Sequence, residues 1–147
     1  MCYMVLLSTD SSEDLSVHND ELVTFSRTLP PLAEVEALAH PHRWFVGSRH
    51  GCSCGFRHLY VGSVSLGFGE PQDWYPEEVE DLEATRRFLS VVKALLAAGA
   101  CIDCIDAWGH ETDSSNLSGT IYVNFAEVSD REYRFFENHR FVLSQAA

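Results

Sequence analysis

The most regular pattern of apolar residues in this chain lies between residues 76 and 98. Apolar side chains recur there at helical spacing, at Val79, Leu82, Leu89, Val92 and Leu96. Acidic residues cluster at the start of this segment and basic residues lie further on, as the helix dipole favours. Pro76 suits the first helical position and Gly99 suits the position just after a helix. The pattern predicts one long amphipathic helix from about Pro76 to Ala98.

Shorter segments on both sides of this helix are rich in β-branched and aromatic residues, which predicts strands. They span residues 2–9, 21–27, 43–48, 56–68, 100–108 and 120–128. A short helix is expected between two prolines, at 32–38. The last segment allows two interpretations, because Ser129 and Glu132 resemble a capping box that opens a helix, whereas 139–144 could form a strand. The order predicts a single α+β domain over 1–147, with a mostly antiparallel sheet of about five or six strands and the helix packed on one face.

The charge balance excludes several classes of partner. The 147 residues include 22 Asp and Glu against 10 Lys and Arg, a net charge of −12. Nucleic acids and anionic membrane surfaces both select clustered basic residues, so neither is expected as a partner. The chain has no apolar run long enough for a membrane helix, and its first residues lack the pattern of a signal peptide. We therefore expect a cytoplasmic protein, and nothing in the composition identifies a small-molecule ligand.

The acidic residues are unevenly distributed. Residues 37–69 contain no Asp or Glu but include three arginines and four histidines, and 70–83 then hold seven acids and no base. One interpretation of the acid-free window is a pair of buried strands, and the other is an electropositive pocket. The acidic helix beside the basic window also permits a homo-oligomer, either head to tail or two-fold.

Five cysteines give the chain its clearest candidate chemistry. In a reducing compartment, clustered cysteines favour metal binding or redox chemistry over structural disulfides. The pairs Cys52-x-Cys54 and Cys101-x-x-Cys104 are two half-sites of the kind that tetrahedral zinc uses, which predicts one zinc per chain. Three histidines could replace one of these ligands, namely His50, His58 and His110. Cys2 stands apart and is left out of this site.

The four-cysteine interpretation carries one geometric condition. Residues three apart on a regular strand face opposite sides of the sheet, so Cys101 and Cys104 could share a metal only if Cys101 lies in the turn before the strand.

Two other interpretations of the cysteines remain open. Cysteine is also often buried as an inert small side chain. Alternatively, Cys52 or Cys54 serves a thiol-dependent enzyme or redox sensor, with the anion- and thiolate-stabilising groups Arg49, His50, Arg57 and His58 around it.

Two weaker candidates complete the set. Arg43, Arg49 and Arg57 could bind an anion without a metal, since arginine suits phosphate and carboxylate groups. The segment 106–113 carries the acid/base or hard-metal candidates Asp106, His110, Glu111 and Asp113, but its spacing matches no known motif and favours a polar loop. The sequence thus favours a non-enzymatic binding or interaction module with a four-cysteine zinc site.

Overall fold

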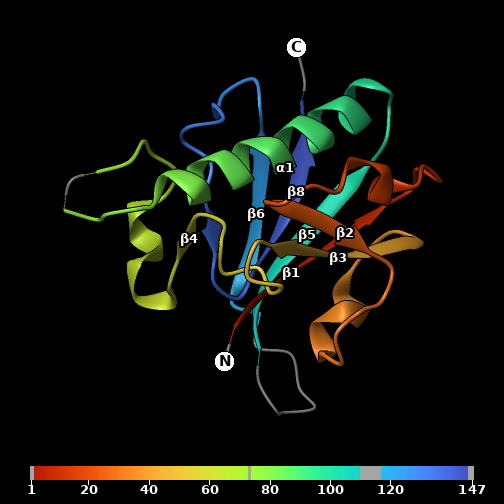
Figure 1. Ribbon diagram of the computed structural model, residues 1–147, viewed down its shortest axis with the longest axis horizontal. Helices are drawn as coiled ribbons and strands as arrows, with labels where there is room; N and C mark the ends of the chain where they lie inside the picture. The colour runs from red at the N-terminus through yellow and green to blue at the C-terminus, as the bar shows by residue number, and fades with distance from the viewer. Residues whose placement is uncertain (1, 73, 110–116, 146–147) are drawn as a thin grey trace.

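A six-stranded sheet forms the centre of the computed structural model, which describes residues 2–72, 74–109 and 117–145 (Figure 1). Its order is β2-β3-β1-β5-β8-β6, and only β6 and β8 pair in parallel. The strands are β1 (Tyr3–Thr9), β2 (Val23–Ser26), β3 (His42–Ser48), β5 (Ile102–Trp108), β6 (Gly119–Asn124) and β8 (His139–Ser144). A separate parallel pair is formed by β4 (His58–Leu59) and β7 (Phe135–Phe136).

One long helix, α1 (Val79–Ala97), crosses one face of the sheet (Figure 1). Its buried residues Phe88, Leu89 and Val92 join the same core cluster as Val5 and Leu7 of β1. Leu89 and Val92 of the stripe seen in the sequence thus lie on the face that packs on the sheet, whereas Val79 at its start is exposed. Three 3₁₀ segments complete the fold, η1 (Leu15–His18), η2 (Ala33–Ala37) and η3 (Val61–Leu66).

The opposite face of the two central strands is covered by the segment around η2. Leu6 of β1 and Ile105 of β5 are fully buried there against Leu32, Val35 and Leu38. Coverage of β1 on both faces matches its sequence, which is apolar from Tyr3 to Leu7 without alternation. The expected α+β fold is confirmed, with a mostly antiparallel sheet and one long helix on one face.

The structure differs from the expectation in three places. The segment 56–68 contributes only His58 and Leu59 to a strand, and the 3₁₀ helix η3 follows directly. The helix α1 begins at Val79, because Glu77 is held in the preceding extended segment by hydrogen bonds from an arginine. Ser129 and Glu132 make the capping-box contact without opening a helix, and the terminal strand β8 forms.

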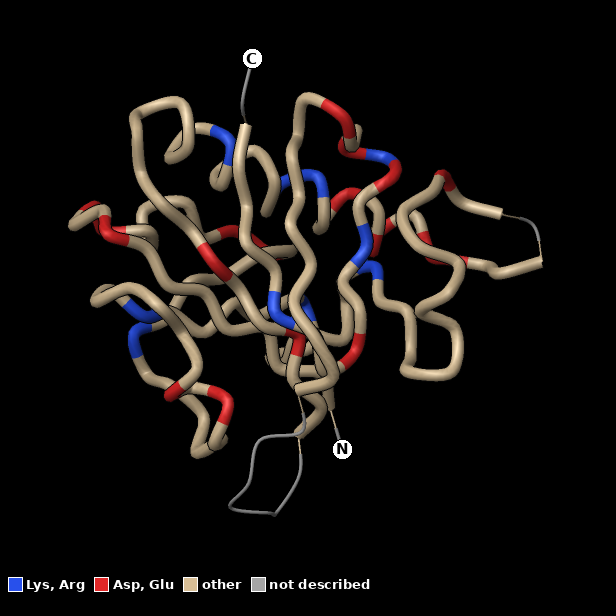
Figure 2. The backbone as a smooth tube through the Cα atoms, turned by 180° about the vertical axis from the view of Figure 1, so that it is seen from behind, with Lys and Arg blue, Asp and Glu red and all other residues tan. Residues whose placement is uncertain are grey.

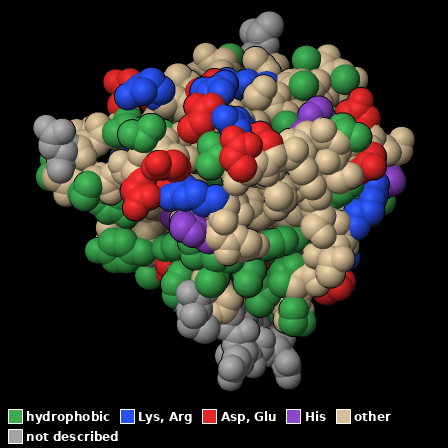
Figure 3. Space-filling model, in the orientation of Figure 1, with side chains coloured by type: hydrophobic (Ala, Val, Ile, Leu, Met, Phe, Trp, Pro, Cys, Tyr) green, Lys and Arg blue, Asp and Glu red, His purple; other side chains and the backbone are tan. Residues whose placement is uncertain are grey.

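Acidic and basic side chains lie next to one another on the upper half of the face in Figure 3, and Figure 2 shows acidic and basic positions along the backbone seen from behind. Arg87 on α1, for example, pairs with Glu83 one turn earlier and with Asp20 and Glu21 next to β2. No helix in the residues that the structure describes combines the length and hydropathy that crossing a membrane requires.

Candidate metal centre

A buried serine anchors the loop between β3 and β4, residues 49–57, to the sheet. Val5 and Val46 face each other in the register of β1 and β3, and the Ser53 hydroxyl bridges them. This hydroxyl accepts from the Val5 N–H at 2.7 Å and donates to the Val46 carbonyl at 2.5 Å. The Ser53 N–H also donates to the Tyr3 carbonyl at 2.9 Å. The loop is thus tied to both strands through the residue between its two cysteines.

This anchor brings three sulfur atoms together. Cys52 and Cys54 flank Ser53, and Cys2 directly precedes Tyr3, whose carbonyl Ser53 binds. The Sγ atoms of Cys2, Cys52 and Cys54 lie within 4.8 Å of one another, and each residue is partly exposed. Within the described ranges, no other His, Cys, Asp or Glu joins this group. The result is a three-cysteine cluster, a name used below for Cys2, Cys52 and Cys54.

The tight turn that enters this cluster depends on two glycines. Gly51 has a φ of 83°, a left-handed conformation that side chains rarely adopt. Gly55 lies so close to Ser48 that a Cβ atom on it would stand 2.7 Å from the serine Oγ. That Oγ accepts from the Gly55 N–H and donates to the Cys52 carbonyl, at 2.9 and 2.6 Å. The glycines that bracket the cysteines therefore allow the chain to curl around the Ser48 hydroxyl.

Hydrogen bonds distinguish the two cysteines of the loop. Burial alone would raise the pKa of Cys52, but bonds from the Cys54 N–H and from the thiols of Cys2 and Cys54 lower it below its ordinary value. Burial, followed by the neighbouring sulfur atoms, raises the pKa of Cys54 to about 12, although its Sγ accepts from the Tyr3 N–H at 3.3 Å. Of the two loop cysteines, Cys52 is therefore the one whose thiolate form the surroundings favour more.

The spacing of the sulfur atoms suits a soft metal ion. Zn(II) binds thiolates at about 2.3 Å in tetrahedral geometry, which puts neighbouring sulfurs roughly 3.8 Å apart. The observed limit of 4.8 Å lies about 1 Å above this spacing, and rotation of partly exposed side chains can close that difference. A positive ion would also stabilise the thiolate of Cys54, which burial and the neighbouring sulfur atoms otherwise disfavour.

The predicted four-cysteine site does not form. Cys104 lies in β5, is fully buried in the core, and has its Sγ 3.9 Å from the Tyr133 hydroxyl. Cys101 is exposed just before β5, where its N–H donates to Asp10. This end of β5 is opposite the end that pairs with Tyr3, and seven strand residues span roughly 20 Å. The CxxC pair therefore lies too far from the CxC pair, and its members differ in burial.

Two arginines of the acid-free window bind acidic residues of the following segment, whereas the third, Arg43, lies 3.9 Å from Glu36, just before the window. Arg49 donates to Glu78 at 2.7 Å and to Asp81 at 2.9 Å. Arg57 is fully buried, donates to Glu77 through two nitrogens, and gives its remaining hydrogen bonds to backbone carbonyls. The opposite charges that the sequence separates thus meet within one chain. The guanidinium groups of Arg49 and Arg57 are therefore both paired with carboxylates.

The two histidines of the window have different surroundings. His50 lies in the exposed turn next to Gly51. His58 is buried, with Nδ1 2.8 Å from Asp106 and Nε2 2.6 Å from the Ser53 carbonyl. Burial alone would lower the pKa of His58, but the charge and hydrogen bond of Asp106 raise it above its ordinary value. Because both ring nitrogens are engaged, neither is available as a base for a thiol.

Asp106 belongs to the strand predicted over 100–108, which forms as β5, and not to the polar loop favoured for the segment 106–113. The residue lies within β5, is fully buried, and accepts from His58 through Oδ2. Burial raises its pKa, with the charge of His58 acting in the opposite direction. Three further candidates from the same segment fall outside the described residues, namely His110, Glu111 and Asp113.

A cavity of about 290 Å³ adjoins the cluster on the side of Cys54. Its walls include Tyr3, His58, Tyr75 and Glu77. A small molecule can therefore approach one of the three sulfur atoms from the cavity.

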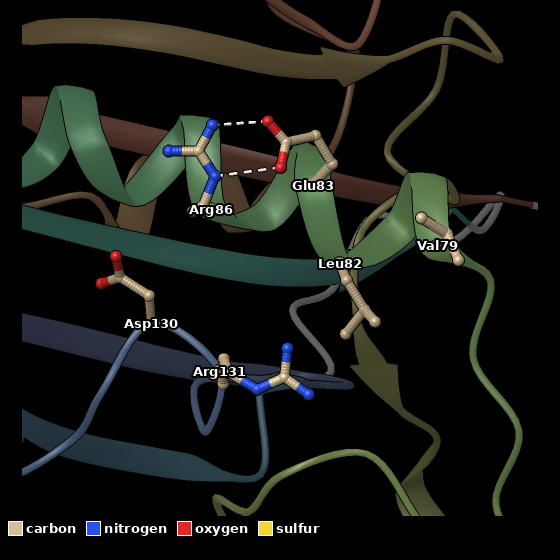
Figure 4. A pocket seen from close by; sticks show the side chains of 6 residues that line it. All are labelled: Val79, Leu82, Glu83, Arg86, Asp130 and Arg131. Atoms are coloured by element: carbon tan, nitrogen blue, oxygen red, sulfur yellow. Dashed lines mark hydrogen bonds and ion pairs between the residues drawn. The ribbon is translucent and has the colours of Figure 1, made fainter.

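A second hollow, of about 210 Å³, lies between the start of α1 and the turn at Asp130 and Arg131 (Figure 4). Each charged side chain around it has a partner of opposite charge. Glu83 binds Arg86, as Figure 4 shows, while Asp130 pairs with Lys93 and Arg131 with Glu70. These pairings leave the hollow without an evident chemical role.

No family model, curated protein or solved structure matches this chain. Its candidate site is therefore defined by geometry alone. The sequence identified Cys52 and Cys54 but missed Cys2, which the fold brings to them from the start of a central strand. The signal that points to it is its position directly before the most apolar strand of the chain, which predicts a fixed place beside the sheet.

Proposed function

We propose that the protein is a binding module that holds one Zn(II) ion through Cys2, Cys52 and Cys54. The observation that carries this proposal is the mutual distance of the three sulfur atoms, at most 4.8 Å. It is supported by the Tyr3 N–H donated to Cys54 and by the lowered pKa of Cys52, since metals bind thiolates. Three protein ligands leave the fourth position of zinc to water or to a group from another molecule.

Metal binding would stabilise the fold around the cluster, because the ion binds the folded chain and not the separated strands. At a free metal concentration 100 times its dissociation constant, the gain is about 2.7 kcal/mol. We therefore expect a chelator to lower the melting temperature of the purified protein.

Elemental analysis of protein purified without added metal tests the proposal. About one zinc per chain is expected in the wild type, and Cys2→Ser, Cys52→Ser and Cys54→Ser should each lose most of it. Cys101→Ser is the matched control, because this exposed cysteine lies at the far end of β5. Metal-free wild type that also fails to bind added zinc would overturn the proposal, and so would equal losses in the control.

A second candidate function is thiol redox sensing, which the closeness of the three sulfur atoms and the lowered pKa of Cys52 favour. The thiolate would attack a hydroperoxide, which is reduced to an alcohol as Cys52 becomes a sulfenic acid. The Cys2 or Cys54 thiol would then displace water and form a disulfide. Mass spectrometry after peroxide treatment tests this: a loss of two hydrogens confined to the cluster supports it, and unmodified thiols refute it.

A further inference from the structure

We propose that the buried pair His58 and Asp106 positions the three-cysteine cluster by holding the Ser53 carbonyl, an inference that rests on the metal site proposed above. His58 Nε2 lies 2.6 Å from this carbonyl, which can only accept, so Nε2 carries a proton. Nδ1 lies 2.8 Å from Asp106 Oδ2. The chain of contacts therefore runs from β5, through the imidazole, to the residue between Cys52 and Cys54.

Two aromatic rings pack on the imidazole. Its ring stacks on Tyr3 with centroids 4.0 Å apart and an interplanar angle of 5°, and Phe135 lies on it at 5.5 Å. Tyr3 follows Cys2 directly and donates its N–H to Cys54. One side chain, that of His58, thus touches the residue next to Cys2 as well as the residue between the two loop cysteines.

Burial of the ionisable pair His58 and Asp106 costs desolvation free energy, which a purely structural role does not require. The His58 side chain is 5% exposed and that of Asp106 is 0%. Asp106 Oδ1 has no hydrogen-bond partner among the described residues, although it is buried. An apolar pair of similar volume often stabilises a fold as well or better. A directed N–H on the Ser53 carbonyl is what the ionisable pair provides and an apolar pair lacks.

Metal sites elsewhere use a carboxylate–imidazole pair to orient a ligand, and removal of such a partner typically lowers metal affinity 10–100-fold. Here the pair acts on the backbone between two ligands and not on a ligand itself. If it holds the carbonyl, it fixes how the main chain directs Cys52 and Cys54 towards Cys2.

The test compares two substitutions at His58 in the full chain. His58→Phe keeps a ring between Tyr3 and Phe135 but removes both nitrogens. His58→Gln places an amide N–H near the position of Nε2 and so keeps the donor to Ser53. Binding is measured by titration with Cd(II), followed by the ultraviolet sulfur-to-metal charge-transfer band. Hydrogen exchange of the Ser53 amide is measured without metal, with the amide of Phe125 on the far side of the sheet as the internal reference.

We expect His58→Phe to weaken Cd(II) binding roughly 10–100-fold and to speed exchange at Ser53 but not at Phe125. His58→Gln should retain most of the affinity and the protection, and His18→Phe, in the exposed η1, should match the wild type. If His58→Phe fails to fold, the glutamine variant decides, because loss of binding and protection despite its N–H overturns the proposal.

The outcomes separate the two proposals. Wild-type affinity and wild-type exchange in His58→Phe would refute the positioning role and leave the metal site standing. Wild type that binds no Cd(II), with faster Ser53 exchange in His58→Phe, would refute the metal site and support the positioning role. Weaker binding in His58→Phe with rescue by His58→Gln supports both.

Discussion

Replacement of Ser53 by alanine is the most direct test of how the loop is built. The serine hydroxyl lies between the Val5 N–H and the Val46 carbonyl, at 2.7 and 2.5 Å. All three residues are buried or nearly so. Ser53→Ala therefore leaves one backbone donor and one backbone acceptor without their partner, in a space vacated by a single oxygen atom.

The magnitude follows from those two groups. An unsatisfied buried polar group costs roughly 1–3 kcal/mol, so the two groups together should lower the free energy of unfolding of Ser53→Ala by roughly 2–6 kcal/mol. With a urea m-value of about 2 kcal/mol/M, the midpoint should fall by about 1–3 M. Urea titration followed by circular dichroism measures this shift. Ser90→Ala, on the exposed side of α1, is the control and should stay within about 0.5 kcal/mol of the wild type.

One result would refute this reasoning. Val5 and Val46 already face each other across β1 and β3. If Ser53→Ala shifts the midpoint no more than Ser90→Ala does, the two strands have closed the gap and bonded directly. The hydroxyl would then be a spacer that sets the loop's position and not a source of stability.

Three further predictions concern other side chains. Cys104→Ala should cost about 1 kcal/mol in urea unfolding and leave the metal content equal to that of the wild type, because this buried thiol contacts Tyr133 in the core and not the three-cysteine cluster. In metal-free protein, the alkylation rate of Cys52 should fall only at a lower pH than that of a free cysteine. A lowered pKa preserves the reactive thiolate until the pH drops below that pKa. A pH–rate profile centred at or above 9.0 would contradict this. Glu77→Ala should destabilise the fold by roughly 3–5 kcal/mol, because it leaves the buried Arg57 charge uncompensated, whereas Glu70→Ala, in an exposed pair, should cost under about 1 kcal/mol in the same assay.

The fold could be predicted wherever a local repeat decides the structure. The apolar stripe between Val79 and Leu96 needs only the helix itself to be recognised, and α1 forms there. The strands β1, β3 and β5 are marked by their own apolar residues. The strand predicted after Leu59 is wrong, because aromatic and β-branched residues also occur in 3₁₀ turns. Three glycines also lie within the ten residues that follow Leu59.

The candidate site was only half predictable, because its geometry depends on contacts distant in sequence. Cys52 and Cys54 are recognisable from their spacing alone. Cys2 joins them through a hydrogen bond between Ser53 and Tyr3, which no local pattern encodes. Cys101 and Cys104 resemble a half-site, but the direction of β5 carries them away from the loop.

The contact between His58 and Asp106 also has a consequence for the order in which the chain matures during synthesis. All three sulfur atoms of the cluster belong to the first 54 residues, whereas Asp106 follows His58 by 48 residues. At a synthesis rate of about 5–20 residues per second, the carboxylate leaves the ribosome several seconds after the thiols. A growing chain would thus contain all three thiols before Asp106 can bind His58. Pairing of β5 with β1 would then fix the arrangement of the thiols. If the cluster binds a metal as proposed, the first 54 residues would determine when the metal can bind. The later strand β5, through Asp106, would determine the affinity of the folded protein.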